Sequence, residues 1–348
     1  MTRISRLVVL GDSLSDRGTI DKRKLLGFIP MALLSGLYGK SPKGRFTNGY
    51  LWGDYYCSAI AEGFEIEDER KKLKLGHTAS ANADISDEFL TDMALRKQNE
   101  TSFSLNDDQH ILFKGERFAR FYCEGGLSAY DYSTSITIDP TKEIPRLILS
   151  SLDKKRKELL AEDKKYAISK AEKAETLVIE WSGANDFITE NEKPTHTEAD
   201  NAINARISNI EALIQNGYRN FVLFNLPDLA LTPRYQAKDQ WEQDNASECC
   251  DYFNKQLAAR CAELNRKYQD LIFQLIFLFL TSIANLKKSM TIQNSMVLIR
   301  RNKKLHLPHL KILKKTKRTR NMKKINYLLL MAICFGTMYT QQWTCTIG

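Results

Sequence analysis

Three short runs of apolar residues along the chain each end at a turn-forming segment. They are Val8–Leu10, which stops at Gly11, then Leu177–Trp181 and Phe221–Phe224. Runs of this length, rich in β-branched and aliphatic residues, predict buried strands. Between the second and third runs, aliphatic residues recur at helical spacing, and a glycine follows where such a helix would end: Ile203, Ile207, Ile210, Leu213, Ile214 and then Gly217.

Strand, helix and strand in this order predict a parallel sheet with helical crossovers, and therefore a three-layer α/β fold with helices on both faces. The segment 151–175 is rich in Lys, Glu and Ala and predicts one or two solvated helices. Ligands of open α/β sheets bind at the carboxyl ends of the strands. Ser13 and the segments 182–186 and 225–228 follow the three strands, so we expect a site where they meet.

Charge divides the chain into two parts. The 348 residues, 43% of them hydrophobic, can form one large core with a smaller appended unit, and the net charge is +9. No Asp or Glu follows Asp270, although Lys and Arg continue to recur. We therefore divide the chain into a domain over residues 1–270 and a basic, acid-free tail over residues 271–348.

The sequence predicts no cofactor and no metal. Its seven cysteines form no CxxC pair and have no nearby histidine at ligand spacing, so neither zinc nor a disulfide framework is indicated, and we expect buried or idle thiols. Residues 1–6 lead straight into the first strand and leave no room for an apolar signal segment. A cytoplasmic location is therefore expected, with export by a signal-independent route as the alternative.

Candidate chemistry begins with Gly11-Asp12-Ser13-Leu14, which places a serine directly after the first strand. A serine is a weak nucleophile unless a base takes its proton and hydrogen-bond donors receive the oxyanion. Three further blocks follow in the chain: Gly44–Trp52, Cys123–Ala129 and Trp181–Asp186. The last of these reads Trp-Ser-Gly-Ala-Asn-Asp and follows the second predicted strand.

These four blocks, in this order, resemble the GDSL, or SGNH, esterase and lipase family. The resemblance covers about residues 5–270 and is closest to the branch with bacterial phospholipases, lysophospholipases and glycerophospholipid:cholesterol acyltransferases. It implies the SGNH-hydrolase fold, with Ser13 as nucleophile and its own backbone N–H as one oxyanion donor. It also implies that Gly126 supplies a second backbone N–H and Asn185 a side-chain amide. The alternative is that both residues serve tight turns.

Other polar and aromatic residues in these blocks have plainer interpretations. Asp12 and Asp16 are expected to cap backbone N–H groups around the serine turn rather than to act as acids. Gly49, Tyr50 and Trp52 either line an acyl or headgroup pocket or pack in the core, and the sequence leaves both open.

The catalytic base that the resemblance implies is missing. In this family the base is a histidine near the C-terminus within an Asp-x-x-His block, where the aspartate orients the imidazole. The chain has five histidines, His77, His110, His196, His306 and His309. The last two lie late in the chain, but neither has a carboxylate three residues before it, so we interpret neither as the base.

A shifted reading frame explains both the acid-free tail and the missing block. Read two nucleotides later, the codons of Phe335–Gln342 permit Trp-Asp-Asp-Val-His-Pro-Thr, an Asp-x-x-His block in which the valine is forced. In the same offset, the codons of Leu286–Leu298 permit Glu-Glu-Val-Tyr-Asp-Asn-Pro-Glu-Gln-Tyr-Gly-Phe. We place the break near Leu271–Leu275. A genuine basic tail that binds membranes or nucleic acid is the alternative, but its apolar runs are shorter than the roughly 20 residues that span a bilayer.

The sequence therefore predicts a serine esterase or lipase of the lysophospholipase, phospholipase A or acyltransferase type. It would act on carboxylic esters of lipids through an acyl-Ser13 intermediate, with severely reduced activity in the chain as translated. A lipid ester is the expected partner, with transient contact at a membrane surface, and no nucleic acid is expected. The alternative is a non-catalytic lipid-binding or partner-binding descendant of such an esterase.

Overall fold

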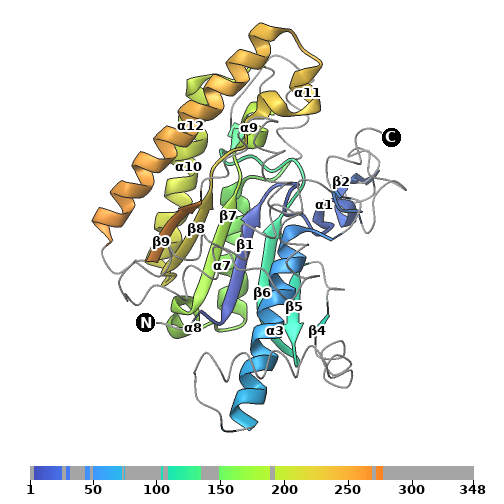
Figure 1. The fold of residues 1–348 in the computed structure, drawn as a ribbon, viewed down its shortest axis with the longest axis vertical. Coiled ribbons are helices and arrows are strands. Elements are labelled where there is room, and N and C mark those ends of the chain that lie inside the picture. The colour runs from blue at the N-terminus through green and yellow to red at the C-terminus, as the bar shows by residue number, and fades with distance from the viewer. Residues whose placement is uncertain are drawn as a thin grey trace, which may run out of the picture. The chain divides into compact units, whose positions relative to one another are not determined.

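The computed structural model describes residues 4–25, 29–31, 44–47, 50–72, 74, 103–104, 109–134, 149–188, 193–268 and 272–276. All of them belong to the compact unit Met1–Leu278, and the second unit, Phe279–Gly348, lies outside the described residues. Figure 1 shows the fold with its elements labelled.

The main sheet has seven strands in the order β4-β5-β6-β1-β7-β8-β9. Five of them, β6, β1, β7, β8 and β9, are parallel, and β5 and β4 extend the β6 edge in antiparallel pairing (Figure 1). The strands are β1 (Arg6–Gly11), β4 (Phe103–Ser104), β5 (His110–Phe113), β6 (Glu116–Cys123), β7 (Thr176–Trp181), β8 (Asn220–Phe224) and β9 (Ile272–Ile276). A separate antiparallel pair joins β2 (Lys24–Leu25) to β3 (Ile29–Pro30).

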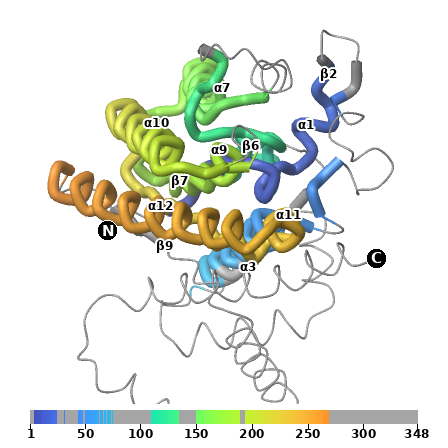
Figure 2. Tube along the Cα trace, turned by 90° about the horizontal axis from the view of Figure 1, so that it is seen from above, coloured from blue at the N-terminus to red at the C-terminus, as the bar shows by residue number. Residues whose placement is uncertain are grey.

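The helices of the described residues cover both faces of this sheet. They are α1 (Thr19–Lys22), α3 (Trp52–Lys72), α7 (Leu152–Lys165), α8 (Lys170–Ala174), α9 (Ala184–Ile188), α10 (His196–Gln215), α11 (Pro233–Gln236) and α12 (Gln240–Lys267), with 3-10 turns η2 (Tyr132–Thr134) and η3 (Leu229–Leu231). Figure 2 shows α7 and α10 on one side of the strands and α3 on the other. None of the helices among the described residues is both long enough and apolar enough to cross a bilayer.

The three predicted strands are confirmed as β1, β7 and β8, and they are neighbours in the sheet. Val8 and Leu10 of β1 join one core cluster with side chains of α7, α10 and α12, such as Leu159, Ile210 and Phe253. Because β1 is buried on both faces, its sequence is continuously apolar instead of alternating. The three-layer α/β fold predicted from the sequence is therefore confirmed.

The crossover helix between β7 and β8 ends as its sequence predicts. Gly217 follows the last residues of α10 with a φ of +105°, a left-handed conformation that favours glycine. Its N–H donates to Ile214 O at 3.0 Å, and the N–H of Tyr218 donates to Leu213 O at 3.1 Å. This pair of hydrogen bonds is the Schellman arrangement, which satisfies the last carbonyl groups of the helix.

The charged segment before β7 forms two helices, α7 and α8, but it is not a fully solvated surface. Lys155 is buried, and its ammonium lies 2.8 Å from a carboxylate oxygen of Glu124, which is also buried. Asp163 is buried as well, and accepts hydrogen bonds from Arg120 at 2.8 Å and Tyr218 at 2.9 Å. The interpretation of this segment as wet helix surface is therefore wrong at these positions, because the partners come from distant strands and loops.

The opposite face of the sheet carries an aromatic cluster at the carboxyl end. Trp52, at the start of α3, lies against Trp181 of β7 and Phe224 of β8, with ring centroids 6.4 and 6.0 Å away. Trp52 and Trp181 are both almost completely buried. Trp52 therefore packs in the core, whereas Tyr50 is 54% exposed and Gly49 lies outside the described residues.

The sheet continues past the boundary predicted at residue 270. Strand β9 pairs with β8 in parallel over five register positions, from Asn220 with Ile272 to Phe224 with Ile276. The segment Leu271–Leu275, where we place the frame break, shares residues 272–275 with this strand, and Leu271 itself lies outside the described residues. The division at residue 270, and the nature of the tail that follows, remain predictions.

Candidate active site

The register of the sheet brings the three predicted site residues to one edge. Gly11, the last residue of β1, pairs with the last residues of both β6 and β7. Ser13 follows β1, Gly126 follows β6, and Asn185 follows β7 in the first turn of α9. Because β6, β1 and β7 are adjacent and parallel, these residues all lie at the carboxyl edge, as expected for a ligand site of an open α/β sheet.

The turn that carries Ser13 is held by its own neighbours. The carboxylate of Asp12 accepts the N–H of Leu14 at 3.0 Å, and the Asp12 carbonyl accepts the N–H of Ser15 at 3.0 Å. Gly11 is required just before this turn because a Cβ there would lie 2.8 Å from the carbonyl oxygen of Trp181. The hydrogen bond from Leu14 confirms the cap predicted for Asp12. The side chain of Asp12 is buried and that of Ser13 is half-buried.

The glycine turn after β6 is tied to the serine turn through β1. The N–H of Glu124 donates to Gly11 O at 3.1 Å, and the N–H of Leu127 donates to Glu124 O at 3.1 Å. Gly126 has a φ of +78°, and a Cβ there would lie 2.7 Å from a methyl carbon of Leu149. The turn therefore requires glycine at this position, whatever further role its N–H has.

Asn185 and Asp186 bind the turn after β7 to the turn after β6. The amide nitrogen of Asn185 donates to Leu127 O at 2.9 Å. The carboxylate of Asp186 accepts the N–H groups of Ala129 at 2.8 Å and Tyr130 at 3.0 Å, and it is completely buried. Sequence reasoning missed the role of Asp186, although a carboxylate beside the predicted oxyanion donor is the local signal that could have indicated it.

Asp16 links the glycine turn to the first helix. Its carboxylate accepts the N–H groups of Gly18 at 2.9 Å and Thr19 at 2.6 Å, at the start of α1. The same carboxylate accepts the N–H of Gly125 at 2.8 Å, next to Gly126. The prediction that Asp16 caps backbone N–H groups is confirmed, and the cap joins two segments that are far apart in the sequence.

The block that begins at Gly44 packs beside this glycine turn. A Cβ on Gly125 would lie 2.2 Å from the ring of Phe46, so the ring rests directly on the turn. Arg45 and Arg17 both bind the buried carboxylate of Asp54, at 2.6 and 2.7 Å. The indole N–H of Trp52 donates to Ser15 Oγ at 3.2 Å. This block therefore supports the serine and glycine turns from the α3 side of the sheet.

A buried ion pair lies beneath the carboxyl edge. Arg206 of α10 donates to a carboxylate oxygen of Glu180 at 2.5 Å and to Phe224 O at 2.8 Å, and both charged side chains are fully buried. Ser182 donates to the second oxygen of the same carboxylate.

Burial raises the pKa of Asp12 to about 7, with the negative charge of Glu180 adding to the effect and the hydrogen bond from Leu14 opposing it.

We expect Asp12→Asn to change the pH dependence of stability. Folding raises the pKa of Asp12 from its usual 3.8, so the folded state binds this proton more tightly. The resulting stabilisation is present at low pH and is lost as the pH rises from about 4 to about 7, with each pH unit in that interval removing about 1.4 kcal/mol. Asparagine retains an acceptor for the Leu14 N–H but cannot ionise.

The variant should therefore gain stability relative to the wild-type chain between pH 5 and pH 8, measured by urea unfolding at both values. An identical pH dependence in the two chains would show that Asp12 titrates in the folded state as it does in water.

The two histidines among the described residues each contact the carboxylate of a glutamate. His110 of β5 lies 2.7 Å from a carboxylate oxygen of Glu162, and His196 lies 2.9 Å from Glu248. These two contacts hold the imidazoles against α7 and α12, and neither contact involves Ser13. The other three, His77, His306 and His309, lie outside the described residues.

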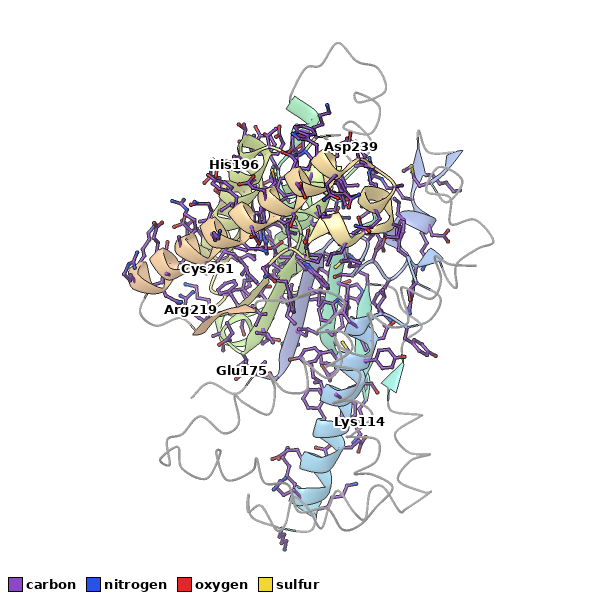
Figure 3. The ribbon with its side chains drawn as sticks, turned by 45° about the horizontal axis from the view of Figure 1, so that its top comes forward. Lys114, Glu175, His196, Arg219, Asp239 and Cys261 are labelled. Carbon is purple, nitrogen blue, oxygen red and sulfur yellow. The ribbon has the colours of Figure 1, made fainter. Side chains whose placement is uncertain are left out.

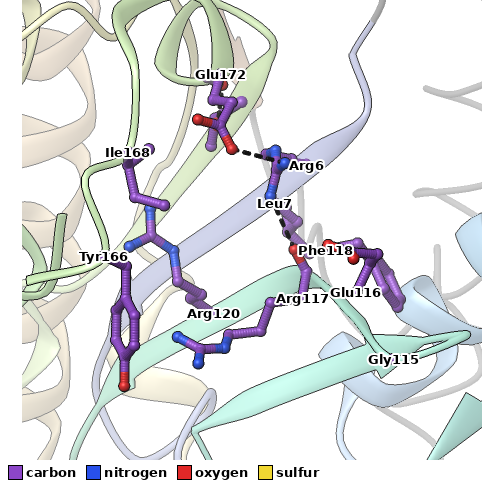
Figure 4. Close-up of a pocket in the computed structure, with 11 residues that line it drawn as sticks. Arg6, Leu7, Gly115, Glu116, Arg117, Phe118, Arg120, Tyr166, Ile168 and Glu172 are labelled. Atoms are coloured by element: carbon purple, nitrogen blue, oxygen red, sulfur yellow. Dashed lines mark hydrogen bonds and ion pairs between the residues drawn. The ribbon is translucent and has the colours of Figure 1, made fainter.

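A cavity of about 240 Å³ lies at the opposite, amino edge of the sheet (Figure 4). Arg6, Arg117 and Arg120 contribute to its wall, but each is engaged by a carboxylate. Arg6 binds Glu172 at 2.7 Å, while Arg117 and Arg120 bind the α7 carboxylates Glu162 and Asp163. The cavity is therefore distinct from the carboxyl-edge site, and its positive charge is already neutralised.

Comparison with known proteins agrees with the three-layer α/β fold described above. Residues 7–296 match the family model of GDSL-like lipases and acylhydrolases, and the chain belongs to this family. The resemblance expected from the four blocks is thereby confirmed.

Among curated proteins, the chain is similar to a phosphatidylcholine-sterol acyltransferase from Aeromonas hydrophila. The two are 26% identical over 256 residues. The aligned region is 73% of this chain and 53% of the acyltransferase, so the chain spans about half of the length of this relative.

Proposed function

We propose that this protein derives from a serine esterase that acts on carboxylic esters of lipids. The observation that carries the proposal is the convergence of Ser13, Gly126 and Asn185 at the ends of three adjacent parallel strands. The similarity to a sterol acyltransferase supports an acylated lipid as the substrate. Contact with a lipid surface during turnover follows from such a substrate.

In the proposed reaction, Ser13 Oγ attacks the acyl carbonyl while a histidine takes the hydroxyl proton. The negative charge that develops on the carbonyl oxygen is received by the backbone N–H groups of Ser13 and Gly126 and by the Asn185 amide. The C–O bond then breaks, and the histidine returns its proton to the departing alcohol. Water, or the hydroxyl group of an acceptor alcohol such as a sterol, attacks the acyl-Ser13 ester and restores the serine.

The component that the sequence does not supply near its C-terminus is the Asp-x-x-His block that would provide this histidine. We propose that the tail is read out of frame and that the Asp-x-x-His block lies in the frame two nucleotides later. Two separate stretches support this, because the codons of both permit acidic sequence in the same offset. With a nucleophile and oxyanion donors but no base, only modest residual catalysis should remain.

The test uses the gene with its frame restored. Purified protein is incubated with lysophosphatidylcholine micelles and with phosphatidylcholine vesicles, with and without cholesterol, and fatty acid and cholesteryl ester are measured by mass spectrometry. Fatty acid alone indicates hydrolysis, and cholesteryl ester indicates acyl transfer. Ser13→Ala should abolish both products, whereas Ser169→Ala, on an exposed serine that caps α8, should leave them unchanged.

Asn185→Ala should lower kcat about 10²–10³-fold, the usual effect of removing one oxyanion donor. Asn216→Ala is the matched control, because this exposed asparagine caps the far end of α10. Tight lipid binding that persists in Ser13→Ala, with no product from the restored chain, would replace the esterase with a lipid-binding descendant.

A further inference from the structure

Three potential metal ligands come together where α10 meets α12, and Figure 3 labels His196 among them. They are His196, the first residue of α10, and Glu248 and Cys249 of α12. His196 Nε2 lies 2.9 Å from both carboxylate oxygens of Glu248, and Cys249 Sγ lies 3.8 Å from one of these oxygens. The three ligand atoms all lie within 4.8 Å of one another.

The imidazole of His196 is held in place by a neighbouring ring. Tyr252, one helical turn after Glu248, stacks on it with the ring centroids 3.8 Å apart and the planes 6° from parallel. The hydroxyl of Tyr252 donates to the carboxylate of Asp200, which belongs to the same helix as His196. This stacking keeps Nε2 directed at Glu248, as surrounding contacts commonly do for a metal-binding histidine.

We propose that His196, Glu248 and Cys249 form a zinc-binding site. Imidazole nitrogen, carboxylate oxygen and cysteine sulfur are the donors that Zn²⁺ takes in proteins, at about 2.0–2.3 Å. Ligands at those distances in a tetrahedron lie roughly 3.3–3.7 Å from one another. The His196–Glu248 and Glu248–Cys249 separations of 2.9 and 3.8 Å lie just outside this range, and the three ligand atoms all lie within 4.8 Å of one another. Side-chain movement would bring them around one ion, with water as the fourth ligand.

Solvent access agrees with such a site. The side chains of His196 and Glu248 are 49% and 60% exposed, so an ion reaches them from solvent, while Cys249 approaches from the buried side. Zinc binding to the Cys249 thiol would replace its S–H bond by an S–Zn bond and release the proton to water.

This site does not depend on the proposed esterase function. Its proposed effect is on the stability of the contact between α10 and α12. A bound ion would join the first turn of α10 to the middle of α12 and stabilise that contact by the free energy of binding. An exposed His–Glu pair alone contributes little to stability. The zinc-bound and zinc-free chains should therefore differ measurably in their free energy of unfolding.

The test measures zinc binding to the reduced, full-length chain. Equilibrium dialysis against Zn²⁺, followed by elemental analysis, should show about one more bound ion in the wild-type chain than in His196→Ala, Glu248→Gln or Cys249→Ala. Loss of one ligand should weaken binding about tenfold or more. Replacing zinc by Co²⁺ should give a thiolate-to-metal absorption band that disappears in Cys249→Ala.

Two control variants match the chemistry of the ligands. Cys250→Ala removes the adjacent buried thiol, and Glu263→Gln removes another exposed carboxylate of α12, so both should bind zinc as the wild type does. Equal zinc content in the wild type and Glu248→Gln, or Co²⁺ binding without the thiolate band, overturns the proposal. Because Glu248 is exposed, that variant keeps the test decisive even if Cys249→Ala fails to fold.

Discussion

Restoring the reading frame is expected to raise ester hydrolysis at least about 10³-fold over the chain as translated. Loss of the triad histidine costs a serine hydrolase several orders of magnitude in kcat, while binding and the oxyanion donors leave a small residual rate. The nucleophile turn, the glycine turn and Asn185 are already assembled in the fold. If the proposed function holds, the restored segment would add the base to the edge of the sheet where these groups lie.

The measurement compares the two chains on a short-chain ester under identical conditions. In the restored chain, Ser13→Ala and replacement of the histidine in Trp-Asp-Asp-Val-His-Pro-Thr should each return the rate to the residual level. Rapid, Ser13-dependent turnover by the chain as translated would falsify the prediction, because a base would then exist elsewhere.

Sequencing the gene from the codon of Arg266 to the stop tests the same idea at the level of DNA. One inserted or deleted base, whose correction yields the Asp-x-x-His block, is the expected finding. If the printed frame is confirmed and the other frame is full of stop codons, the basic tail is genuine and lipid binding without catalysis becomes the stronger interpretation.

Glu180→Ala is expected to destabilise the fold by about 3–5 kcal/mol. Removing one member of a buried ion pair leaves the other as an uncompensated charge in the core. Arg206 is fully buried, and its remaining hydrogen bonds to the backbone carbonyls of Phe224 and of residue 180 do not neutralise its charge. Urea unfolding of the full-length chain, followed by circular dichroism, measures the loss.

The control removes both charges together. Glu180→Leu combined with Arg206→Met replaces the pair with apolar side chains, and the double variant should be clearly more stable than Glu180→Ala. If the single and double variants lose the same free energy, the cost comes from altered packing at this position and the buried charge is not its cause.

The sheet and the three site turns could be predicted because their signals are local. Each of β1, β7 and β8 is a short apolar run that ends in turn residues, and Gly217 marks the end of α10. The carboxyl-edge rule then places Ser13 and Asn185 together without any contact being known. Such inferences need only the order of elements along the chain.

The contacts that hold the site together were not predictable in this way. Asp186 binds residues more than fifty positions earlier, and Lys155 lies in a charged run that suggests a solvated surface. His196 and Glu248 are 52 residues apart, so local ligand spacing cannot indicate a metal site there. In each case the crossover connections of the parallel sheet bring the partner close, and a local sequence pattern does not indicate which distant residue that partner is.

The parallel order β6-β1-β7 also determines when the chemistry becomes available during synthesis. Ser13 is among the first residues to be translated, but the turns that contain Gly126 and Asn185 follow only after the next two strands beside β1. A nascent chain that has made β1 alone carries an ordinary, unactivated hydroxyl group. If the proposed function holds, Ser13 therefore stays unactivated until β6 and β7 have been added beside β1.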